Sequence, residues 1–202
     1  MNILIVKYLP SSEESNTLKL LNHFKSKIKS HSVEEIDLIK SAPIVHNLET
    51  MKAYKQRNFG GLTLDSGLAK AIEPMDKLTQ QFSKADLIVL VTPMHNFSLP
   101  GIVKTYFDAI MQSGVVFKYE GEKQIGLMKK SKFLTLYTSM GSYTGEYGFM
   151  DNLKTILKIE LDFMGFGSYE FVHASTGNTA TVEIHMKKAI EKIDAVANKW
   201  IL

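Results

Sequence analysis

Two hydroxyl side chains and one amide side chain form the segment Ser15-Asn16-Thr17, directly before a helical pattern of apolar residues. That pattern consists of Leu18, Leu21, Phe24 and Ile28. The N–H groups in the first turn of a helix have no partner within the helix, and the helix dipole favours an anion beside them. Ser15, Asn16 and Thr17 could therefore hold a phosphate without a lysine or arginine. The alternative is that Ser15 or Thr17 only caps the helix, which is common for serine and threonine.

Two other loops carry polar residues directly after apolar runs that are long enough for buried strands. The loop after Leu87–Val91 contains Pro93, Met94, His95, Asn96 and Phe97, and the loop after Phe133–Tyr137 contains Ser139, Met140, Gly141 and Ser142. In an open parallel sheet, ligands bind beyond the carboxyl ends of the strands. No G-x-G-x-x-G motif follows the first strand and no Walker loop is present, so one phosphate site with a planar ring beyond it favours a mononucleotide such as FMN.

His95 is the titratable side chain of these three loops, and an unperturbed imidazole changes its charge near neutral pH. It could donate a proton to a reaction product, or it could face solvent or pack within its loop. His173, Glu183 and His185 are the other candidates for a chemical role, as metal ligands. Their spacing matches no recognised motif, so no metal site is expected.

The elements that must position these loops are five strand-like runs that alternate with helical patterns. The runs are Ile3–Val6, Val33–Ile39, Leu87–Val91, Phe133–Tyr137 and Tyr169–Ala174. This alternation predicts a three-layer α/β sandwich, in which a parallel sheet has helices on both faces. Because crossovers are right-handed, the flavodoxin-like order 2-1-3-4-5 is the best fit for five strands. The loops after the first, third and fourth strands then converge on one crevice.

Several segments depart from this regular alternation. Residues 41–64 show few periodic signals and are predicted to be a long, mobile excursion of the kind that often covers a ligand. Val115–Tyr119 and Gln124–Met128 predict a small hairpin outside the main sheet. Pro74 interrupts an apolar helical stripe, so a kinked helix or two short helices are expected. No repeat or linker indicates a second domain, and residues 1–202 are predicted to form a single domain.

Composition excludes several classes of function. The chain has 24 basic and 21 acidic residues, and the basic ones are scattered, so no nucleic-acid partner is expected. The absence of cysteine excludes disulfides, thiolate metal sites and a cysteine nucleophile. No apolar stretch is long enough to span a bilayer, and the N-terminal apolar run is predicted to be a strand rather than a leader. A cytoplasmic protein without a membrane partner is therefore expected.

The longest motif of the chain is a spaced pattern across residues 93–119. Its parts are Pro93-Met-His-Asn-Phe97, Pro100, Lys104, Tyr106-Phe-Asp108 and Gly114-Val-Val-Phe-Lys-Tyr119, with Ser139-Met-Gly-Ser142 and Phe163-Met-Gly-Phe-Gly167 further on. This pattern resembles the signature of FMN-dependent NADH-azoreductases, within the flavodoxin-like NAD(P)H:quinone oxidoreductase family. The resemblance implies reduction of quinones, azo compounds or both by NADH or NADPH, through two-electron hydride transfer and bound FMN in a ping-pong sequence.

The resemblance also implies roles for the three loops. Ser15–Thr17 would hold the FMN phosphate, Pro93–Phe97 would line the ribityl chain and the isoalloxazine ring, and Ser139–Ser142 would close over the pyrimidine edge. Backbone N–H groups of the last two loops could stabilise the negative charge that the ring gains on reduction, so that no titrating catalytic side chain is strictly required.

This sequence departs from the family pattern in three places. Leu9 stands where the family often has a serine, so one phosphate contact could shift to Ser11 or Ser12. His95 stands in a place usually held by tyrosine. Met140-Gly-Ser142 replaces a more usual basic, glycine-rich sequence. These departures bear on substrate preference more than on FMN binding.

Homodimers in the family imply that Phe117 and Tyr119 lie over the flavin of a partner subunit. They would form a slot for small planar aromatic substrates, which Phe59 could close. The alternatives are that Phe117 and Tyr119 pack within their hairpin or in an ordinary dimer interface, and that Phe59 lies in a mobile surface loop.

Three other functions compete with the oxidoreductase. An electron-carrier flavoprotein without its own turnover is disfavoured by the net charge of +3 and the basic isoelectric point, because flavodoxin-type carriers are usually strongly acidic. Hydrolysis of an acyl-carrier phosphodiester lacks paired carboxylates or a histidine metal cluster to activate water. A non-enzymatic interaction module would bind no FMN. The choice between NADH and NADPH, and the physiological acceptor, stay open.

Overall fold

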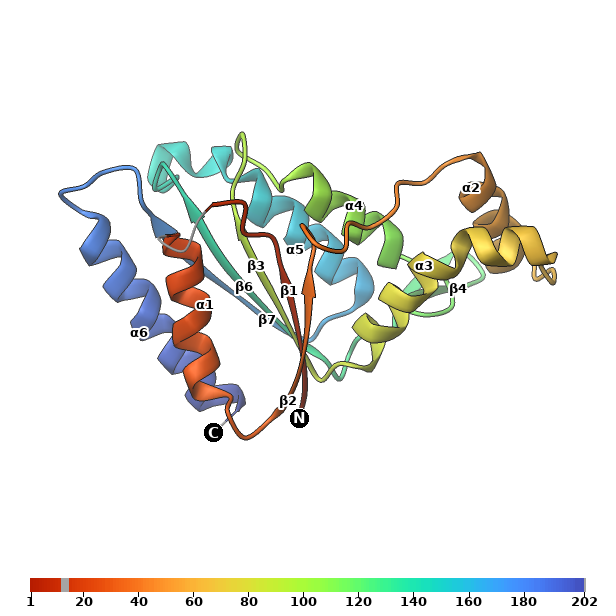
Figure 1. Ribbon diagram of the computed structural model, residues 1–202, viewed down its shortest axis with the longest axis horizontal. Coiled ribbons are helices and arrows are strands. Elements are labelled where there is room, and N and C mark those ends of the chain that lie inside the picture. Colours follow the sequence, from red (N-terminus) through yellow and green to blue (C-terminus); the bar gives the residue numbers. More distant parts are fainter. Residues whose placement is uncertain (12–14, 202) are drawn as a thin grey trace.

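The computed structural model describes residues 1–11 and 15–201, and the possible phosphate contact Ser12 lies outside these residues. A five-stranded parallel sheet has the order β2-β1-β3-β6-β7 (Figure 1). Its strands are β1 (Asn2–Lys7), β2 (Ser32–Asp37), β3 (Leu87–Pro93), β6 (Lys132–Ser139) and β7 (Ser168–Ser175). Counted within this sheet alone, the order is the predicted 2-1-3-4-5. The labels differ because the hairpin strands β4 (Phe117–Glu120) and β5 (Lys123–Gly126) form a separate antiparallel pair.

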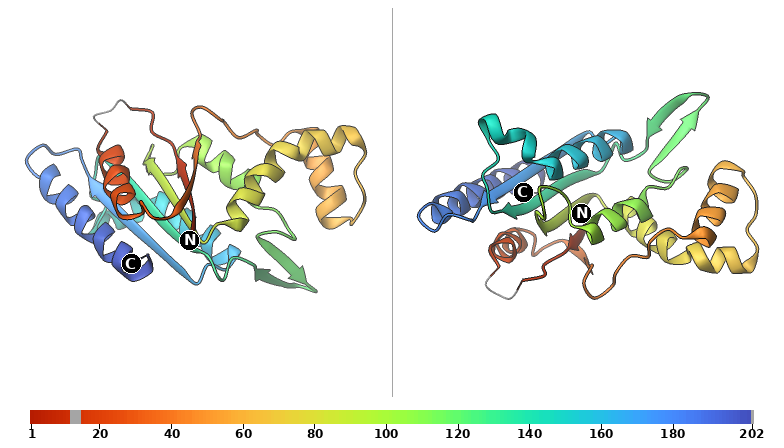
Figure 2. Two further views of the ribbon diagram at one scale, coloured as in Figure 1. Left: turned by 60° about the horizontal axis from the view of Figure 1, so that its bottom comes forward. Right: turned by 90° about the horizontal axis from the view of Figure 1, so that it is seen from above.

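Helices cover both faces of the sheet (Figures 1 and 2). One face carries α1 (Asn16–Lys27) and α6 (Val182–Trp200), and the other carries α3 (Ser66–Lys84), α4 (Gly101–Ile110) and α5 (Asn152–Met164). A 3-10 helix, η2 (Gly145–Met150), lies between β6 and α5. The central strands β1 and β3 are buried on both faces, which explains their continuous apolar sequences.

Pro74 lies inside α3, which is one helix rather than two short ones. The buried stripe of this helix, Leu68, Ile72, Met75 and Phe82, extends on both sides of the proline. Because packing of an amphipathic face supplies most of the stability of a helix in a protein, the hydrogen bond lost at Pro74 does not end α3.

Residues 41–64, predicted to be a long, mobile excursion, contain two short helices. They are α2 (Leu48–Tyr54) and the π-helical turn η1 (Lys55–Phe59). The Asn47 side chain accepts from the Thr50 N–H, and the Thr50 hydroxyl accepts from the Asn47 N–H, which forms a capping box at the start of α2. A seven-residue helix is too short to show a helical period, so the sequence pattern did not reveal it.

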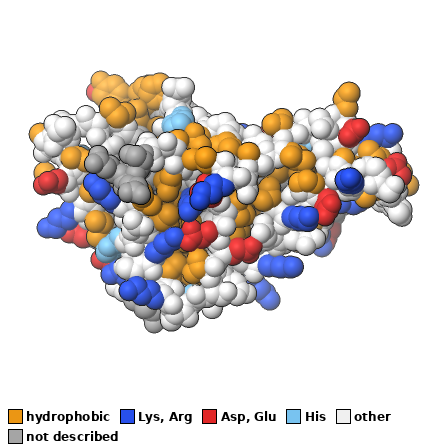
Figure 3. Space-filling view, in the orientation of Figure 1, with side chains coloured by type: hydrophobic (Ala, Val, Ile, Leu, Met, Phe, Trp, Pro, Cys, Tyr) orange, Lys and Arg blue, Asp and Glu red, His pale blue; other side chains and the backbone are white. Residues whose placement is uncertain are grey.

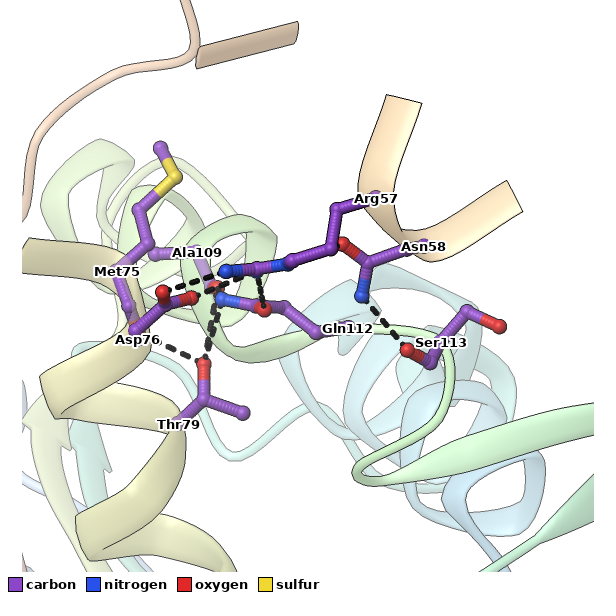
Figure 4. A network of polar contacts seen from close by, with 8 residues as sticks. All are labelled: Arg57, Asn58, Met75, Asp76, Thr79, Ala109, Gln112 and Ser113. Carbon is purple, nitrogen blue, oxygen red and sulfur yellow. Dashed lines mark hydrogen bonds and ion pairs between the residues drawn. The ribbon is translucent and has the colours of Figure 1, made fainter. Parts of the chain in front are cut away.

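Arg57 holds this segment against the scaffold (Figure 4). Its guanidinium donates to both carboxylate oxygens of Asp76 on α3 at 2.7 and 2.8 Å, and to Gln112 Oε1 at 2.9 Å. Asn58 Nδ2 donates to the Ser113 carbonyl oxygen at 2.7 Å. A bidentate arginine–carboxylate pair fixes direction as well as distance, so η1 is attached to α3 and to the loop after α4.

The Arg57→Met variant is expected to lose this attachment. The free energy of unfolding should fall by roughly 2 kcal/mol, because charge-assisted hydrogen bonds are lost and the Asp76 carboxylate is left without its main partner. Trypsin should cleave within residues 41–64 faster than in the parent protein. The exposed Lys55→Met variant removes the same charge from the same turn and serves as control. Equal cleavage rates in the two variants would mean that Arg57 does not anchor the segment.

Candidate functional site

A pocket of about 410 Å³ opens at the carboxyl edge of the sheet, between the N-terminus of α1 and the loops after β3 and β6. It is lined by Pro10, Ser11, Ser15, Asn16, Thr17, Pro93, Met94, His95, Thr138, Ser139, Met140 and Thr176. These described lining residues include no lysine, arginine or carboxylate. A larger cavity of about 470 Å³ lies at the amino edge, beside Asn2 and Ser32. Because ligands of parallel sheets bind beyond the carboxyl ends of the strands, the first pocket is the candidate site.

One corner of the pocket is the start of α1. The Ser15 hydroxyl accepts a hydrogen bond from the Leu18 N–H at 3.4 Å, which confirms the predicted helix cap. A hydroxyl can accept and donate at the same time, so this cap leaves the Ser15 O–H proton free to donate into the pocket. Thr17 is buried, and its hydroxyl lies 2.6 Å from Thr138 Oγ1 on β6. The first turn contains no acidic residue, so its dipole and free N–H groups favour an anion in this corner.

The loop after β3 is a tight turn from His95 to Ser98. These two residues exchange backbone hydrogen bonds of 3.1 and 2.9 Å. The residues between them, Asn96 and Phe97, have positive φ angles of 45° and 66°, as in a type I′ turn. The left-handed region is tolerated by asparagine but strained for phenylalanine. The Asn152 N–H donates to the Phe97 carbonyl at 3.0 Å, and this contact with the start of α5 helps to hold the strained turn.

His95 lies on the pocket rim with an exposed side chain. The ring of Tyr8 packs edge-on against its imidazole, with 5.6 Å between the ring centroids. The imidazole therefore touches both the pocket and the loop after β1.

The loop after β6 is fastened to the end of β7 by its carbonyl oxygens. The Ser139 oxygen accepts from Thr176 N at 2.8 Å and from the Thr176 hydroxyl at 3.2 Å. The Met140 oxygen accepts from Gly177 N at 3.1 Å and from the Ser175 hydroxyl at 3.0 Å. A Cβ atom at Gly177 would lie 2.5 Å from the Met140 oxygen, so this approach requires glycine. Because C=O and N–H point in opposite directions across a trans peptide, the N–H groups of these two peptides point away from β7.

A cluster of polar side chains, buried except for the half-buried His173, lies behind this loop. The Tyr137 hydroxyl donates to Asp151 Oδ2 at 2.6 Å, and the Tyr137 ring stacks on His173 with 4.6 Å between centroids. His173 Nε2 lies 2.6 Å from Ser139 Oγ. Burial and the Asp151 carboxylate raise the pKa of the Tyr137 hydroxyl, while burial lowers the pKa of His173. Both side chains are therefore uncharged near neutral pH.

A family model described as a flavodoxin-like fold matches residues 1–197. An FMN-dependent NADH:quinone oxidoreductase of Photobacterium profundum is 30% identical to this chain, over 96% of this chain and 99% of that protein. The chain belongs to the FMN-dependent NADH:quinone oxidoreductase family. The resemblance inferred from the spaced motif is thus confirmed.

Two further comparisons agree with membership of the FMN-dependent NADH:quinone oxidoreductase family. A protein of that name from Bacillus anthracis is 29% identical over 98% of this chain and 96% of its own length. The crystal structure of a Bacillus anthracis FMN-dependent NADH-azoreductase in complex with FMN matches with a TM-score of 0.88 at 26% identity, covering 98% of this chain and 99% of that chain.

The sequence predicted most of the residues that line the pocket of this quinone oxidoreductase family member, but several lining residues were missed. Asn96, Phe97, Gly141 and Ser142 lie in the predicted loops but not in the pocket lining. Pro10, Ser11, Thr138 and Thr176 do line it; Ser11 was considered only as a substitute contact, and the other three were not predicted. Thr176 directly follows β7, the neighbour of β6. The predicted strand order already places the loop after β7 beside the loop after β6, and this adjacency indicates Thr176 as a lining residue.

Phe117, Tyr119 and Phe59 do not lie at the pocket of the same chain. They belong to the hairpin and to η1, at the opposite end of the molecule from α6 (Figures 1 and 2). Phe117 is only 5% exposed and packs on Phe163, with 4.7 Å between the ring centroids. Tyr119 and Phe59 are 50% and 60% exposed. A role for these aromatics in substrate binding would therefore require a second copy of the chain.

The described part of the chain contains no group of three or more histidine, cysteine, aspartate or glutamate side chains placed to hold a metal ion. Within the same residues, no helix is long and apolar enough to cross a membrane.

Proposed function

We propose that this protein reduces quinones, azo compounds or both with electrons from NADH or NADPH, by two-electron hydride transfer in a ping-pong sequence with FMN as cofactor. The observation that carries the proposal is the pocket at the carboxyl edge of the sheet, where the N-terminus of α1 meets the loops after β3 and β6. Membership of the FMN-dependent NADH:quinone oxidoreductase family supports the same activity.

The donor set of the pocket fits FMN. At one end, Ser15, Asn16 and Thr17 offer hydroxyl, amide and first-turn N–H donors to a phosphate, and the first turn of α1 itself contains no acidic residue. At the other end, Met94 and Met140 supply apolar surface for a flat ring system. The pocket volume of about 410 Å³ lies within the range of small-molecule sites.

FMN held in this pocket would supply the hydride chemistry between the nicotinamide and the acceptor. The residues of the chain would bind and orient it. Pro93–Phe97 and Ser139–Ser142 would flank the ring, and the N–H groups that point away from β7 would stabilise negative charge at its pyrimidine edge. His95, at the rim, could deliver a proton to the acceptor from solvent.

The proposed active form is a homodimer. In support, Tyr119 and Phe59 expose large parts of their rings although neither lines the pocket of its own chain. In a dimer they would form, with Phe117 behind them, an aromatic wall over the partner's flavin for small planar aromatic substrates. Sedimentation of the protein as a monomer at assay concentrations would contradict this arrangement.

Three further predictions belong to the proposal: residues 1–202 form one domain, the protein has no nucleic-acid partner, and it works in the cytoplasm. In support of the second, basic and acidic side chains are interspersed on the face shown in Figure 3, without a basic stripe on that face.

The Asn96→Asp variant tests whether the turn after β3 faces the flavin. Aspartate tolerates the positive φ of 45° at this position, so the turn should persist. A carboxylate beside the ring would repel its charge on reduction, so flavin reduction by NADH is expected to slow by roughly tenfold. The Asn96→Gly variant keeps the backbone conformation without a charge and should reduce at nearly the parental rate. An unchanged rate and unchanged FMN affinity in Asn96→Asp would remove Asn96 from the site.

A further inference from the structure

The Ser139 hydroxyl joins the loop after β6 to the interior of the protein. Its oxygen lies 2.6 Å from the Gly141 carbonyl oxygen and 2.6 Å from His173 Nε2. A carbonyl oxygen only accepts, so the single hydroxyl proton must point at Gly141. The Ser139 oxygen is then free to accept, and the imidazole must donate its Nε2–H to it. The contacts thus assign the Nε2–H tautomer to His173.

Two neighbours hold this imidazole in place. His173 on β7 and Tyr137 on β6 are register partners, and their rings stack with an angle of 21° between the planes. The Tyr137 hydroxyl is fixed in turn by Asp151, whose other carboxylate oxygen caps α5 by accepting from Lys154 N at 3.0 Å. The donor that faces Ser139 is therefore set by the sheet and by the start of α5.

The hydroxyl of Ser139 determines the direction of one particular peptide, the one between Gly141 and Ser142. The carbonyl oxygen of this peptide accepts a hydrogen bond from the Ser139 hydroxyl. The carbonyl oxygens of Ser139 and Met140 accept from N–H groups at the end of β7. Because each N–H opposes the carbonyl of its own peptide, the N–H groups of Met140, Gly141 and Ser142 all point away from their anchors. The first two are set by backbone contacts with β7. The third depends on the side-chain pair of Ser139 and His173.

We propose that His173 is a positioning residue, which acts through Ser139 to direct the Ser142 N–H toward the pyrimidine edge of the flavin. This inference rests on the proposed function, because it assumes that FMN binds in the pocket beside Ser139. The reduced flavin ring carries more negative charge than the oxidised ring. An N–H donor that points at its pyrimidine edge therefore stabilises the reduced ring more. His173 would therefore raise the affinity for reduced FMN more than the affinity for oxidised FMN.

The first test compares the variants His173→Phe and His173→Gln by the midpoint potential of bound FMN. Phenylalanine keeps the stack on Tyr137 but donates nothing, whereas the glutamine amide can donate from nearly the same place. His173→Phe should lower the ratio of reduced to oxidised affinity roughly tenfold, as expected for one hydrogen bond. This ratio corresponds to a potential about 30 mV more negative for a two-electron couple. His173→Gln should restore most of the parental potential.

A parental potential in His173→Phe, or an equal shift in both variants, would overturn the proposal. The Ser139→Ala variant guards against a failure of His173→Phe to fold. It should show the same shift, and the double variant should show no more, because the two residues act in one chain. Additive shifts would also overturn the proposal.

The second test needs no flavin. The ¹⁵N chemical shifts of His173 in the apoprotein should report the Nε2–H tautomer, and the Nδ1–H tautomer would contradict the hydrogen-bond assignment. With that tautomer assignment upheld, a parent apoprotein that binds no FMN would refute the proposed function, and the positioning role with it. Bound FMN with unshifted potentials in the variants would refute the positioning role alone.

Discussion

The Asn16→Asp variant is expected to bind FMN roughly 100-fold more weakly than the parent protein, while the apoprotein becomes slightly more stable. Asn16 is the first residue of α1 and lines the proposed phosphate corner. Two unit charges 4 Å apart repel by about 4 kcal/mol at an effective dielectric constant of 20, and solvent reduces this value. The same carboxylate interacts favourably with the dipole of α1, by about 0.5 kcal/mol. Fluorescence titration of the apoprotein with FMN measures the first effect, and thermal unfolding measures the second.

In Asn16→Asp, weaker FMN binding together with higher stability of the apoprotein would indicate a phosphate site. A residue that served only the helix end would change stability without weakening FMN binding. The Ser66→Asp variant adds a carboxylate to the exposed first residue of α3, away from the pocket, and should leave FMN affinity unchanged. The Asn16→Ala variant removes the amide without adding charge and should weaken binding much less than Asn16→Asp. Parental FMN affinity in Asn16→Asp would show that the phosphate does not bind at the start of α1.

The Gly126→Ala variant is expected to lower the free energy of unfolding by about 3 kcal/mol, at the upper end of the usual cost of overpacking. A Cβ atom at Gly126 would overlap Gly165 and the carbonyl carbon of Met164 at the end of α5. The backbone cannot move away easily, because Met128 N donates to the Met164 oxygen at 2.9 Å beside this contact. Gly165 itself ends α5 in the left-handed conformation, with a φ of 80°. The hairpin that carries Phe117 and Tyr119 should therefore detach from α5.

Urea unfolding and the fluorescence of hairpin tyrosine measure the effect of Gly126→Ala. Gly101 provides the matched control, because it begins α4 without a positive φ, and a Cβ atom added there would meet no neighbouring part of the described chain within 4 Å. Gly101→Ala should be neutral or slightly stabilising, since alanine restricts the unfolded chain. Equal stabilities for the two variants would mean that the hairpin does not depend on the contact between Gly126 and Gly165.

The sheet and two walls of the pocket could be predicted because their signals are local. A doubly buried strand such as Leu87–Val91 has a continuous apolar sequence, and the loop after it carries its polar residues directly in the chain. The helix cap at Ser15 depends on its immediate neighbours, and it too followed from residue type and position. Helix periodicity failed only where the helix was short, as in Leu48–Tyr54.

Contacts between side chains on different strands were beyond the reach of sequence patterns. Thr138 enters the pocket because β6 lies beside α1, where its hydroxyl meets Thr17. His173 was considered only as a metal ligand, and its position beside Tyr137 and Ser139 depends on the register between β6 and β7. A shift of one residue in that register would turn His173 to the opposite face of the sheet. Such contacts follow from tertiary structure, which single-sequence patterns do not encode.

The visible spectrum of the purified protein tests the central claim most directly. We expect the yellow absorbance of bound FMN, which anaerobic NADH or NADPH bleaches and a quinone restores over many turnovers. Bleaching without steady-state turnover would indicate an electron carrier instead of an oxidoreductase. A colourless protein that gains no flavin absorbance when FMN is added would contradict the assignment of the pocket as a flavin site.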